Sequence, residues 1–308
     1  MVSTAATKPF TLTSHVVNVA SVPQRSAFRY PGGKTWLVPY IRLWLRSSPN
    51  PIKLLVEPFA GGAIVGLTAA FEALADRVLL VELDTDVSAV WKTILGRNNT
   101  WLAQRIKNFE LKPETVRLIL SSRHRSTRER AFATILRNRV QRGGIMAPGA
   151  GLMKNGENGK GLSSRWYPET LSKRITDIRA LRGIIKFHKD DGLKFIKKNL
   201  HRKDAVFFID PPYTIAGRRL YRHPDIDHRE LFNLMRRSAA DFLMTYDDSK
   251  EIRDLIIEFR FDCETVAMKN THNAKIDELL IGRNLNWLRR APASQQPSLG
   301  FAPQTLPG

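Results

Sequence analysis

The hydrophobic pattern of the chain alternates between short apolar runs and longer segments with helical periodicity. Apolar runs of this length, bounded by polar or turn residues, predict buried β-strands rather than core helices. Helical patterns lie between them, for example from Val87 to Leu95 and in an Ala-rich stretch ending near Ala75. Strand alternating with helix predicts an α/β fold with a mostly parallel, doubly wound sheet. The six predicted strands are 52–57, 77–83, 184–188, 205–210, 241–246 and 261–268.

One helix start is especially clear, in the segment "DHRELFNLMRRS". Asp227 is a good N-cap residue, and Glu230 three positions later predicts a capping box. Leu231, Leu234 and Met235 then recur at helical spacing, so they are expected to line the buried face of this helix.

The alternation stops between residues 98 and 176, where an Arg-dense helical pattern precedes a Gly-rich stretch. Eight Arg against one Glu between positions 117 and 142 exceed what solubility requires, so we expect phosphate contacts and base recognition there. A Gly-rich loop that merely connects domains is the alternative. The expected organisation is a flexible arm (1–24), a catalytic domain (25–97 and 177–290), a mainly helical insertion (98–176) and a disordered tail (291–308). The candidate DNA contacts are Arg123, Arg125, Arg137, Arg139, Arg142, Lys154, Lys160 and Arg165.

The charge balance favours a polyanionic partner. The formal net charge is +20 and the isoelectric point is near 10.4. No strongly basic amphipathic helix stands out and no apolar run approaches the roughly 20 residues that span a bilayer, so nucleic acid is preferred over a membrane. The single Cys263 excludes an intrachain disulfide and suits the reducing cytoplasm.

The strand at 205–210 runs directly into an unusual turn, Asp210-Pro211-Pro212-Tyr213. The acid is expected at the carboxyl end of its strand, where open α/β sheets bind ligands. The two prolines stiffen the turn while the Pro211 carbonyl remains an acceptor, and Tyr213 adds a flat ring. These groups could hold a planar molecule that bears an NH₂ group. An ordinary strand-terminating proline turn is the alternative.

Three further segments complete the candidate site. The turn "EPFAGGA" (57–63) lets a ligand approach backbone N–H groups, and Glu82 follows at the spacing at which a carboxylate accepts from ribose hydroxyls. Together they suggest an adenosine-bearing cofactor, with a surface glutamate as the alternative for Glu82. The segment "FRYPGGKT" lacks the first glycine of a phosphate-binding P-loop, but it presents Tyr30 and Lys34. Asp191 follows another strand and is equally well explained as a helix N-cap.

An amine-holding turn beside an adenosine-bearing cofactor suggests amine methylation. Adenine N6, cytosine N4 and adenine in RNA remain open as acceptors, as does a catalytically inactive DNA-binding protein. Cytosine C5 methylation requires a Pro-Cys nucleophile, which the sequence lacks, and the seven His show no ligand cluster for a metal.

Six motifs occur in the order found in Dam-like (D12 class) site-specific DNA adenine-N6 methyltransferases, which the chain resembles over roughly residues 26–285: "FRYPGGK", "VEPFAGGA", "VELD", "IDPPY", "LMTYDD" and "ELLIGRN". The resemblance implies a seven-stranded, Rossmann-like methyltransferase sheet, S-adenosyl-L-methionine as cofactor and a flipped adenine in duplex DNA as acceptor. It also implies a cytoplasmic, nucleoid-associated monomer, and it admits a cognate restriction endonuclease as a partner. In the Gly- and Asn-rich segment 142–166 and the residues just before it, only the dipeptide Asn138-Arg139 matches the family. The implied cofactor contacts are Tyr30, Lys34, Glu57, Phe59, Ala60, Gly61, Gly62, Glu82, Asp191 and Asp210, and the implied catalytic residues are Asp210, Pro211, Pro212 and Tyr213.

Overall fold

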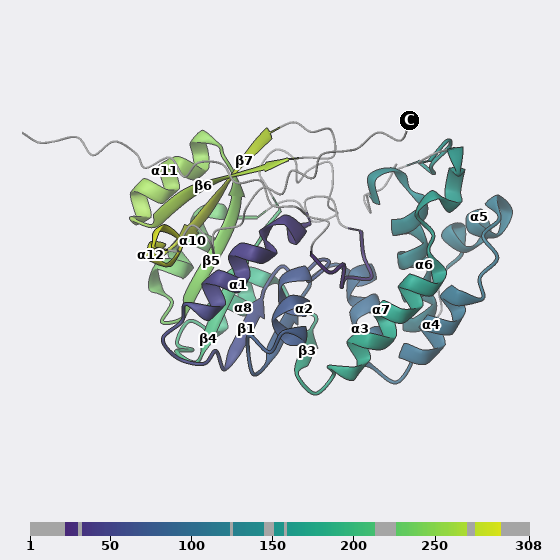
Figure 1. Cartoon of the computed structure of the whole chain (residues 1–308), viewed down its shortest axis with the longest axis horizontal. Helices are drawn as coiled ribbons and strands as arrows, with labels where there is room; N and C mark the ends of the chain where they lie inside the picture. The colour runs from purple at the N-terminus through teal and green to yellow at the C-terminus, as the bar shows by residue number, and fades with distance from the viewer. Residues whose placement is uncertain are drawn as a thin grey trace, which may run out of the picture.

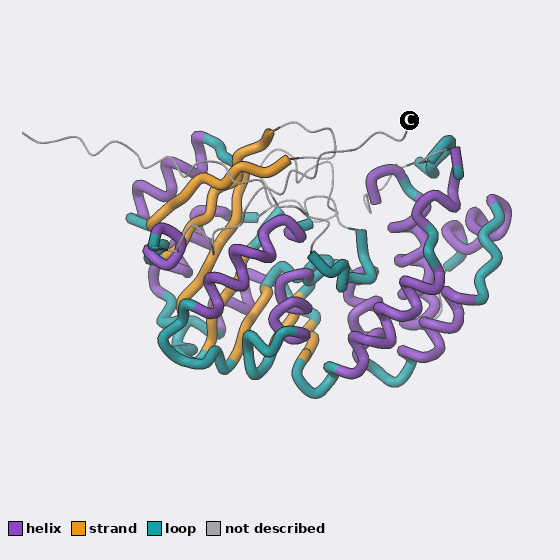
Figure 2. Tube along the Cα trace, viewed as in Figure 1, coloured by secondary structure: helices purple, strands orange, loops and turns teal. Residues whose placement is uncertain are grey.

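The computed structural model describes residues 22–29, 33–123, 126–144, 151–156, 159–212, 226–269 and 275–290. These residues form a twisted sheet with helices on both faces and a helical lobe at its side (Figures 1 and 2). No helix in the described ranges is long and apolar enough to cross a membrane. Several parts of the chain for which the sequence makes predictions lie outside the described residues: Tyr30, Arg125, Tyr213, most of the N-terminal arm and the C-terminal tail.

The sheet has seven strands in the order β3-β2-β1-β4-β5-β7-β6. The first five strands in this order run parallel, whereas β7 is antiparallel to both β5 and β6. This arrangement confirms the expected Rossmann-like methyltransferase sheet. The strands are β1 (Leu54–Glu57), β2 (Val78–Val81), β3 (Ile185–His188), β4 (Ala205–Ile209), β5 (Asp241–Asp247), β6 (Asp262–Lys269) and β7 (Lys275–Gly282).

All six strands predicted from apolar runs are present, and no strand end differs from its predicted position by more than two residues. The pattern did not predict β7, which was implied only by the family resemblance. Its first half contains Lys275, Asp277 and Glu278, so no continuous apolar run is visible in the sequence. Its burial comes from its position between β5 and β6, which a local pattern does not encode.

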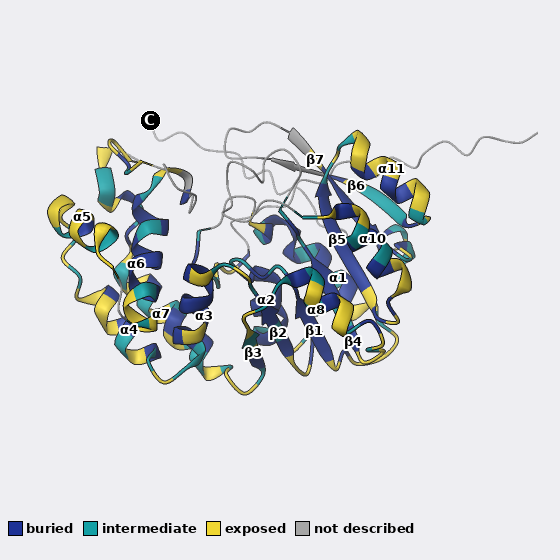
Figure 3. Ribbon diagram, turned by 180° about the vertical axis from the view of Figure 1, so that it is seen from behind, coloured by how far each residue is buried: buried dark blue, intermediate teal, exposed yellow. Residues whose placement is uncertain are grey.

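Two cores lie on opposite faces of the sheet (Figure 3). Leu54 and Val56 pack with α8, α10 and α11, whereas the intervening Leu55 packs with α1, α2 and α3. Alternating sides is what a strand buried on both faces must do. The six covering helices are α1 (Val38–Arg46), α2 (Ile64–Phe71), α3 (Thr85–Leu95), α8 (Gly192–Lys198), α10 (His228–Arg237) and α11 (Lys250–Phe259).

The N-cap prediction for α10 is confirmed, because the Asp227 carboxylate accepts a hydrogen bond of 2.8 Å from the Glu230 amide. The Glu230 carboxylate instead accepts a hydrogen bond of 3.2 Å from the Asn233 side chain, so Asp227 caps the helix without the predicted reciprocal bond of a capping box. Leu231, Leu234 and Met235 are buried as expected.

The helical lobe comprises α4 to α7, residues 99–180, and lies beside the β3 edge of the sheet (Figure 1). The Arg-dense stretch forms two helices rather than one, because Ser126 starts α6 with a capping box to Glu129. The expected domain boundary at residue 176 falls inside α7. The elements of the lobe are α4 (Asn99–Lys107), α5 (Pro113–Ser121), α6 (Thr127–Val140), the 3₁₀ turns η3 (Arg142–Gly144) and η5 (Gly161–Arg165), and α7 (Pro168–Ala180).

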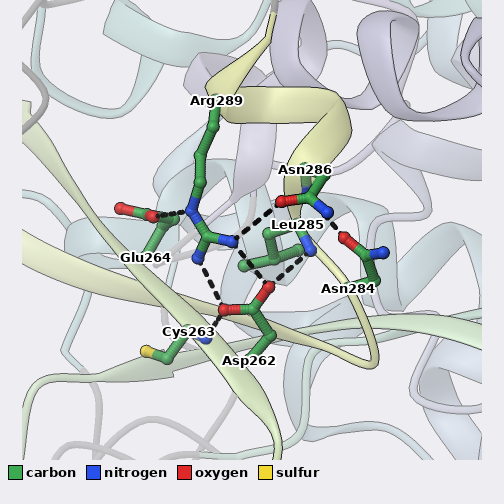
Figure 4. A network of polar contacts seen from close by, with 7 residues as sticks. All are labelled: Asp262, Cys263, Glu264, Asn284, Leu285, Asn286 and Arg289. Atoms are coloured by element: carbon green, nitrogen blue, oxygen red, sulfur yellow. Dashed lines mark hydrogen bonds and ion pairs between the residues drawn. The ribbon is translucent and has the colours of Figure 1, made fainter. Parts of the chain in front are cut away.

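The short helix α12 (Asn286–Arg289) anchors the end of the described chain to the start of β6 (Figure 4). The Arg289 guanidinium donates to both carboxylate oxygens of Asp262, at 2.5 and 2.8 Å, and to Glu264 at 2.6 Å. The Leu285 amide also donates to Asp262, at 2.8 Å. This forked pairing fixes the β6–β7 hairpin, and with it β7 beside β5.

Candidate active site

Acidic side chains gather at one edge of the sheet. Glu57 ends β1, Glu82 follows β2, Asp191 follows β3 and Asp210 follows β4. Because these four strands are parallel neighbours, their carboxyl ends meet at the same edge. The topology therefore brings together the acids that the sequence singled out separately.

Asp210 is held by two donors on the same oxygen. Its Oδ1 lies 2.9 Å from the Lys34 ammonium and accepts a hydrogen bond of 2.9 Å from the Thr245 hydroxyl of β5. The side chain is 25% exposed, so a ligand can still reach it. Two fixed contacts restrict rotation of the carboxylate, and Pro211 and Pro212 follow immediately in the chain. Asp210 is thus a preorganised charged acceptor at the mouth of the site.

Lys34 lies at the start of η2 (Lys34–Leu37) and is only 3% exposed. Besides Asp210, its ammonium lies 3.7 Å from the carboxylate of Glu278, a buried residue of β7. A buried ammonium needs such partners, because desolvation otherwise costs several kcal/mol. Lys34 was expected to contact the cofactor; its described contacts are with Asp210 and Glu278.

Glu57 was also expected among the cofactor contacts, but it is only 3% exposed. Its Oε1 accepts a hydrogen bond from the Gly66 amide in the first turn of α2. Burial, reinforced by the nearby charge of Asp210, raises the pKa of Glu57 to about 8. A Cβ at Gly66 would lie 2.8 Å from the Val78 side chain, so glycine is required for this approach. Glu57 therefore shapes the strand-to-helix turn from inside.

The glycine turn is fastened to the end of β2. Ala60 donates from its amide to Val81, and Gly61 donates from its amide to Glu82 Oε2 at 3.0 Å. Gly61 has φ +46°, a conformation that glycine adopts without strain. The indole N–H of Trp91 donates to the Gly61 carbonyl at 2.9 Å. The loop is therefore rigid before any ligand arrives.

Glu82 serves this loop and can also serve a ligand. Its second oxygen accepts from the Asp84 amide at 2.8 Å, and burial raises the pKa of Glu82 to about 7. A carboxylate has about four acceptor positions, so ribose hydroxyls can still donate to it. The half-buried Glu82, the tight glycine turn and their common place at the sheet edge fit an adenosine-bearing cofactor.

Asp191 caps α8, accepting a hydrogen bond of 2.9 Å from the Lys194 amide. The cap explanation is thus correct, and a ligand role for Asp191 is left as a proposal. The next residue, Gly192, packs against the glycine turn: a Cβ there would lie 2.5 Å from the Phe59 ring and 2.6 Å from the Pro58 carbonyl. This close approach brings the β3–α8 connection against residues 58 and 59 of the glycine turn.

The candidate DNA contacts divide into two groups. Two arginines of α6 point inward: Arg137 pairs with Asp86 of α3 at 3.2 Å, and Arg139 is 6% exposed and donates to the Ala27 carbonyl. Burial lowers the pKa of Arg139 to about 10. This placement differs from the expected phosphate contact, because packing against α3 and the N-terminal segment takes both side chains. The remaining described candidates are on or near the surface: Arg123, Arg142, Lys154, Lys160 and Arg165.

Some of these surface residues surround a hollow in the lobe. Arg142, Met153, Lys154, Asn155 and Gly156 line an open cavity of about 280 Å³. Its cationic and amide donors suit base edges or phosphate oxygens. No cluster of His, Cys, Asp or Glu that could hold a metal occurs among the described residues.

The sequence motifs do not indicate the contacts that three residues make in the structure. Thr245 lies within "LMTYDD" and Glu278 within "ELLIGRN", but neither motif indicates that the side chains converge on Asp210 and Lys34. Asn138 was noted only as part of a familiar dipeptide. Its flanking residues, Arg137 and Arg139, are charged, so the local pattern does not indicate that Asn138 is buried.

Solved structures with similar folds include several methyltransferases. The rRNA methyltransferase AviRa from Streptomyces viridochromogenes is 12% identical, with a TM-score of 0.35, covering 85% of this chain and 90% of that one. The precorrin-6y C5,15-methyltransferase from Geobacter metallireducens is 8% identical, with a TM-score of 0.33, covering 80% and 86%. The tRNA methyltransferase TrmK from B. subtilis is 10% identical, with a TM-score of 0.33, covering 79% and 64%. No curated protein matches the sequence.

A family model provides the decisive comparison. The model described as "D12 class N6 adenine-specific DNA methyltransferase" matches residues 30–268, which is most of the chain and includes every strand from β1 to β5. The match agrees with the strand order, the fastened glycine turn and the fixed Asp210. The chain belongs to the D12 class of N6 adenine-specific DNA methyltransferases, which use S-adenosylmethionine.

Proposed function

We propose that Asp210, Pro211 and Tyr213 hold the amine of a flipped adenine, while the edge formed by residues 59–62, Glu82 and Asp191 holds the cofactor. The observation that carries this proposal is the double fastening of Asp210 Oδ1 by Lys34 and Thr245, each at 2.9 Å. A carboxylate fixed in this way needs little reorganisation when it accepts from an NH₂ group.

The chemistry that these residues supply is positioning and electrostatics. Adenine N6 is a weak nucleophile because its lone pair is delocalised into the ring. Asp210 and the Pro211 carbonyl accept from the amine hydrogens and so favour a pyramidal nitrogen with an available lone pair. When bound, S-adenosylmethionine supplies the electrophilic methyl group. Removing the base from the duplex costs a few kcal/mol, and stacking on Tyr213 offsets part of this cost.

We assign the DNA contacts to the exposed cations of the helical lobe and its Gly-rich segment. Arg123 and Arg125 contact phosphates, whereas the cavity beside Arg142 and Lys154, together with Lys160 and Arg165, recognises base edges. The buried Arg139 is not included in this set. The exposed positions of Arg123, Arg142, Lys154 and Lys160 support the assignment. Deleting residues 154–160 in a folded, active enzyme should change the methylated sequence set if the segment recognises bases.

The enzyme is proposed to act as a monomer on duplex chromosomal DNA in the cytoplasm, with a cognate restriction endonuclease as a candidate partner. The test of the proposal is expression in a host that lacks DNA methylation, followed by mapping of modified positions on the genome. N6-methyladenine at one recurring sequence is the expected result. Label found only in N4-methylcytosine or in RNA would contradict it.

A further inference from the structure

Residues 25–29, which we call the strap, lie between the helical lobe and the cofactor edge. The strap directly precedes the "YPGGK" segment that ends at Lys34. Within it, Ala27 is fully buried and Phe28 is 5% exposed. Its backbone is therefore enclosed, and its polar groups need partners in the protein.

On the lobe side, the strap is held by side chains of α6 and α7. Asn138 forms two hydrogen bonds with the same strap residue: its Oδ1 accepts from the Arg29 amide and its Nδ2 donates to the Arg29 carbonyl, both at 2.8 Å. The same Nδ2 donates to the Gly144 carbonyl at 3.0 Å. Arg139 and Arg174 donate to the carbonyls of Ala27 and Ser26, at 2.5 and 3.2 Å.

The carboxamide of Asn138 thus pairs with Arg29 as a neighbouring strand would. The space around this pairing is tight, because a Cβ at Gly144 would lie 2.6 Å from the Arg29 carbonyl, and Gly144 has φ +73°. Asn138 itself is 0% exposed. A side chain this buried and this closely matched fixes the strap in one position.

On the sheet side, the strap touches the cofactor edge directly. The Ser26 hydroxyl donates to the Gly62 carbonyl at 2.6 Å. The Phe28 ring lies 6.1 Å from the ring of Trp91, whose indole N–H donates to the Gly61 carbonyl. The strap is therefore bonded directly to the glycine turn at Gly62 and indirectly to Gly61 through Trp91, and it is held to the lobe by three residues of α6 and α7.

We infer that Asn138, a residue of the DNA-contacting lobe, is a positioning residue for the cofactor site and acts through the strap. It does not reach the cofactor edge itself; it fixes Arg29, and the strap in turn supports Gly61 and Gly62 and leads to Lys34. This inference rests on the proposed assignment of residues 59–62 and Glu82 to the cofactor. Its consequence is that a change inside the lobe alters cofactor affinity without touching the cofactor or DNA contacts.

The test is Asn138→Asp, which keeps an acceptor for the Arg29 amide but sets a second oxygen against the carbonyls of Arg29 and Gly144. The matched control is Asn99→Asp. Asn99 is also 0% exposed and donates to two carbonyls, Ile94 of α3 at 2.7 Å and Ile175 of α7 at 2.8 Å, and neither bond involves a residue of the strap. Both variants lose two donated bonds, so both should lower the melting temperature.

Only Asn138→Asp should weaken S-adenosylmethionine binding. The dissociation constant should rise about tenfold, which is within the usual range for coupling between two sites. The KM for the cofactor should rise likewise, while kcat at saturating cofactor and DNA affinity stay close to those of Asn99→Asp. Equal cofactor affinity of the two folded variants would overturn the inference. Failure of the wild-type protein to bind the cofactor would instead overturn the proposed function.

A milder variant covers the case in which Asn138→Asp does not fold. Ser26→Ala removes the hydroxyl bond to Gly62 and the bond of 3.1 Å that the same hydroxyl accepts from the Phe28 amide within the strap. Ser47→Ala removes a hydroxyl bond to the Trp44 carbonyl of α1, away from the site. Cofactor affinity should fall about threefold for Ser26→Ala, corresponding to the loss of one ordinary hydrogen bond to the glycine turn, and stay unchanged for Ser47→Ala. No difference between these two variants would equally overturn the inference.

Discussion

The sheet edge and the helical lobe use charged residues in opposite ways. At the sheet edge the acids stand at strand ends, and each described one has a specific partner, such as Lys34 for Asp210 or Gly61 for Glu82. In the lobe, two arginines of the same helix, α6, differ in burial: Arg139 is buried against Ala27, whereas Arg128 is exposed and lies over the Trp101 ring. Backbone topology fixes the positions at the edge, whereas side-chain packing fixes them in the lobe.

We expect the greatest loss of activity when the Asp210 carboxylate is removed from the sheet edge. Asp210→Ala removes the charged acceptor and should lower kcat by at least about 100-fold, which is roughly 2.7 kcal/mol of transition-state stabilisation. DNA affinity should stay within a few-fold, because Asp210 is not among the proposed phosphate contacts. Single-turnover methylation and DNA titration measure the two quantities separately.

The opposite end of the same strand provides the control. Asp204 directly precedes β4 and pairs with Arg202 in an exposed ion pair at 2.6 Å. Asp204→Ala should leave kcat unchanged, because Asp204 lies at the end of β4 away from Asp210. It should also change stability little, since exposed ion pairs contribute at most about 1 kcal/mol to the free energy of unfolding. If Asp210→Ala kept more than a tenth of wild-type kcat, Asp210 would not be the central acceptor.

The second prediction concerns the pH dependence of stability. The pKa of Glu57 is raised to about 8 in the folded protein, mainly by burial, above its usual value near 4.5. The folded state therefore binds more protons than the unfolded state across this interval, so the free energy of unfolding falls as pH rises from about 4.5 to about 8. The loss should amount to a few kcal/mol and end above pH 8.

Glu57→Gln should remove this slope, because a glutamine oxygen still accepts from Gly66 but carries no charge. The variant should therefore be more stable than the wild type at pH 8, and similar to it at pH 5. Denaturant unfolding at a series of pH values measures the difference. Parallel curves for the two proteins would mean that Glu57 is ionised at neutral pH and that the interior stabilises its charge.

The sequence could predict the sheet edge because a strand end and a parallel topology are enough to place Asp210 and Glu82. It could not predict that Thr245 and Glu278 converge on Asp210 and Lys34, since strand order in the sheet, including the place of β7 beside β5, is not encoded locally. In the lobe, the sequence shows the number of arginines but not which of them are buried. Arg137 and Arg139 lie on the sides of α6 that meet α3 and the strap, whereas Arg123 follows the end of α5.

Arg139→Ala tests whether packing within the protein, rather than DNA contact, accounts for the position of this arginine in the lobe. Removing this guanidinium leaves the Ala27 carbonyl unpaired in a buried place, which should lower the free energy of unfolding by about 2 kcal/mol. The salt dependence of DNA binding should not change, because Arg139 is 6% exposed. A variant with unchanged stability but a flatter salt slope would mean that Arg139 reaches DNA after all.

The smallest expected effect is that of Arg123→Ala, the exposed counterpart of Arg139. Arg123 lies just after α5 and has its side chain in solvent, so its removal should change stability by less than about 0.5 kcal/mol. If it contacts one phosphate, its loss should weaken binding a few-fold for every duplex and reduce the slope of log K against log salt by about one. Binding measured on two unrelated duplexes at several salt concentrations separates this result from base recognition. An effect confined to one duplex would assign Arg123 to a base edge, and no effect on either would place the DNA path away from the end of α5.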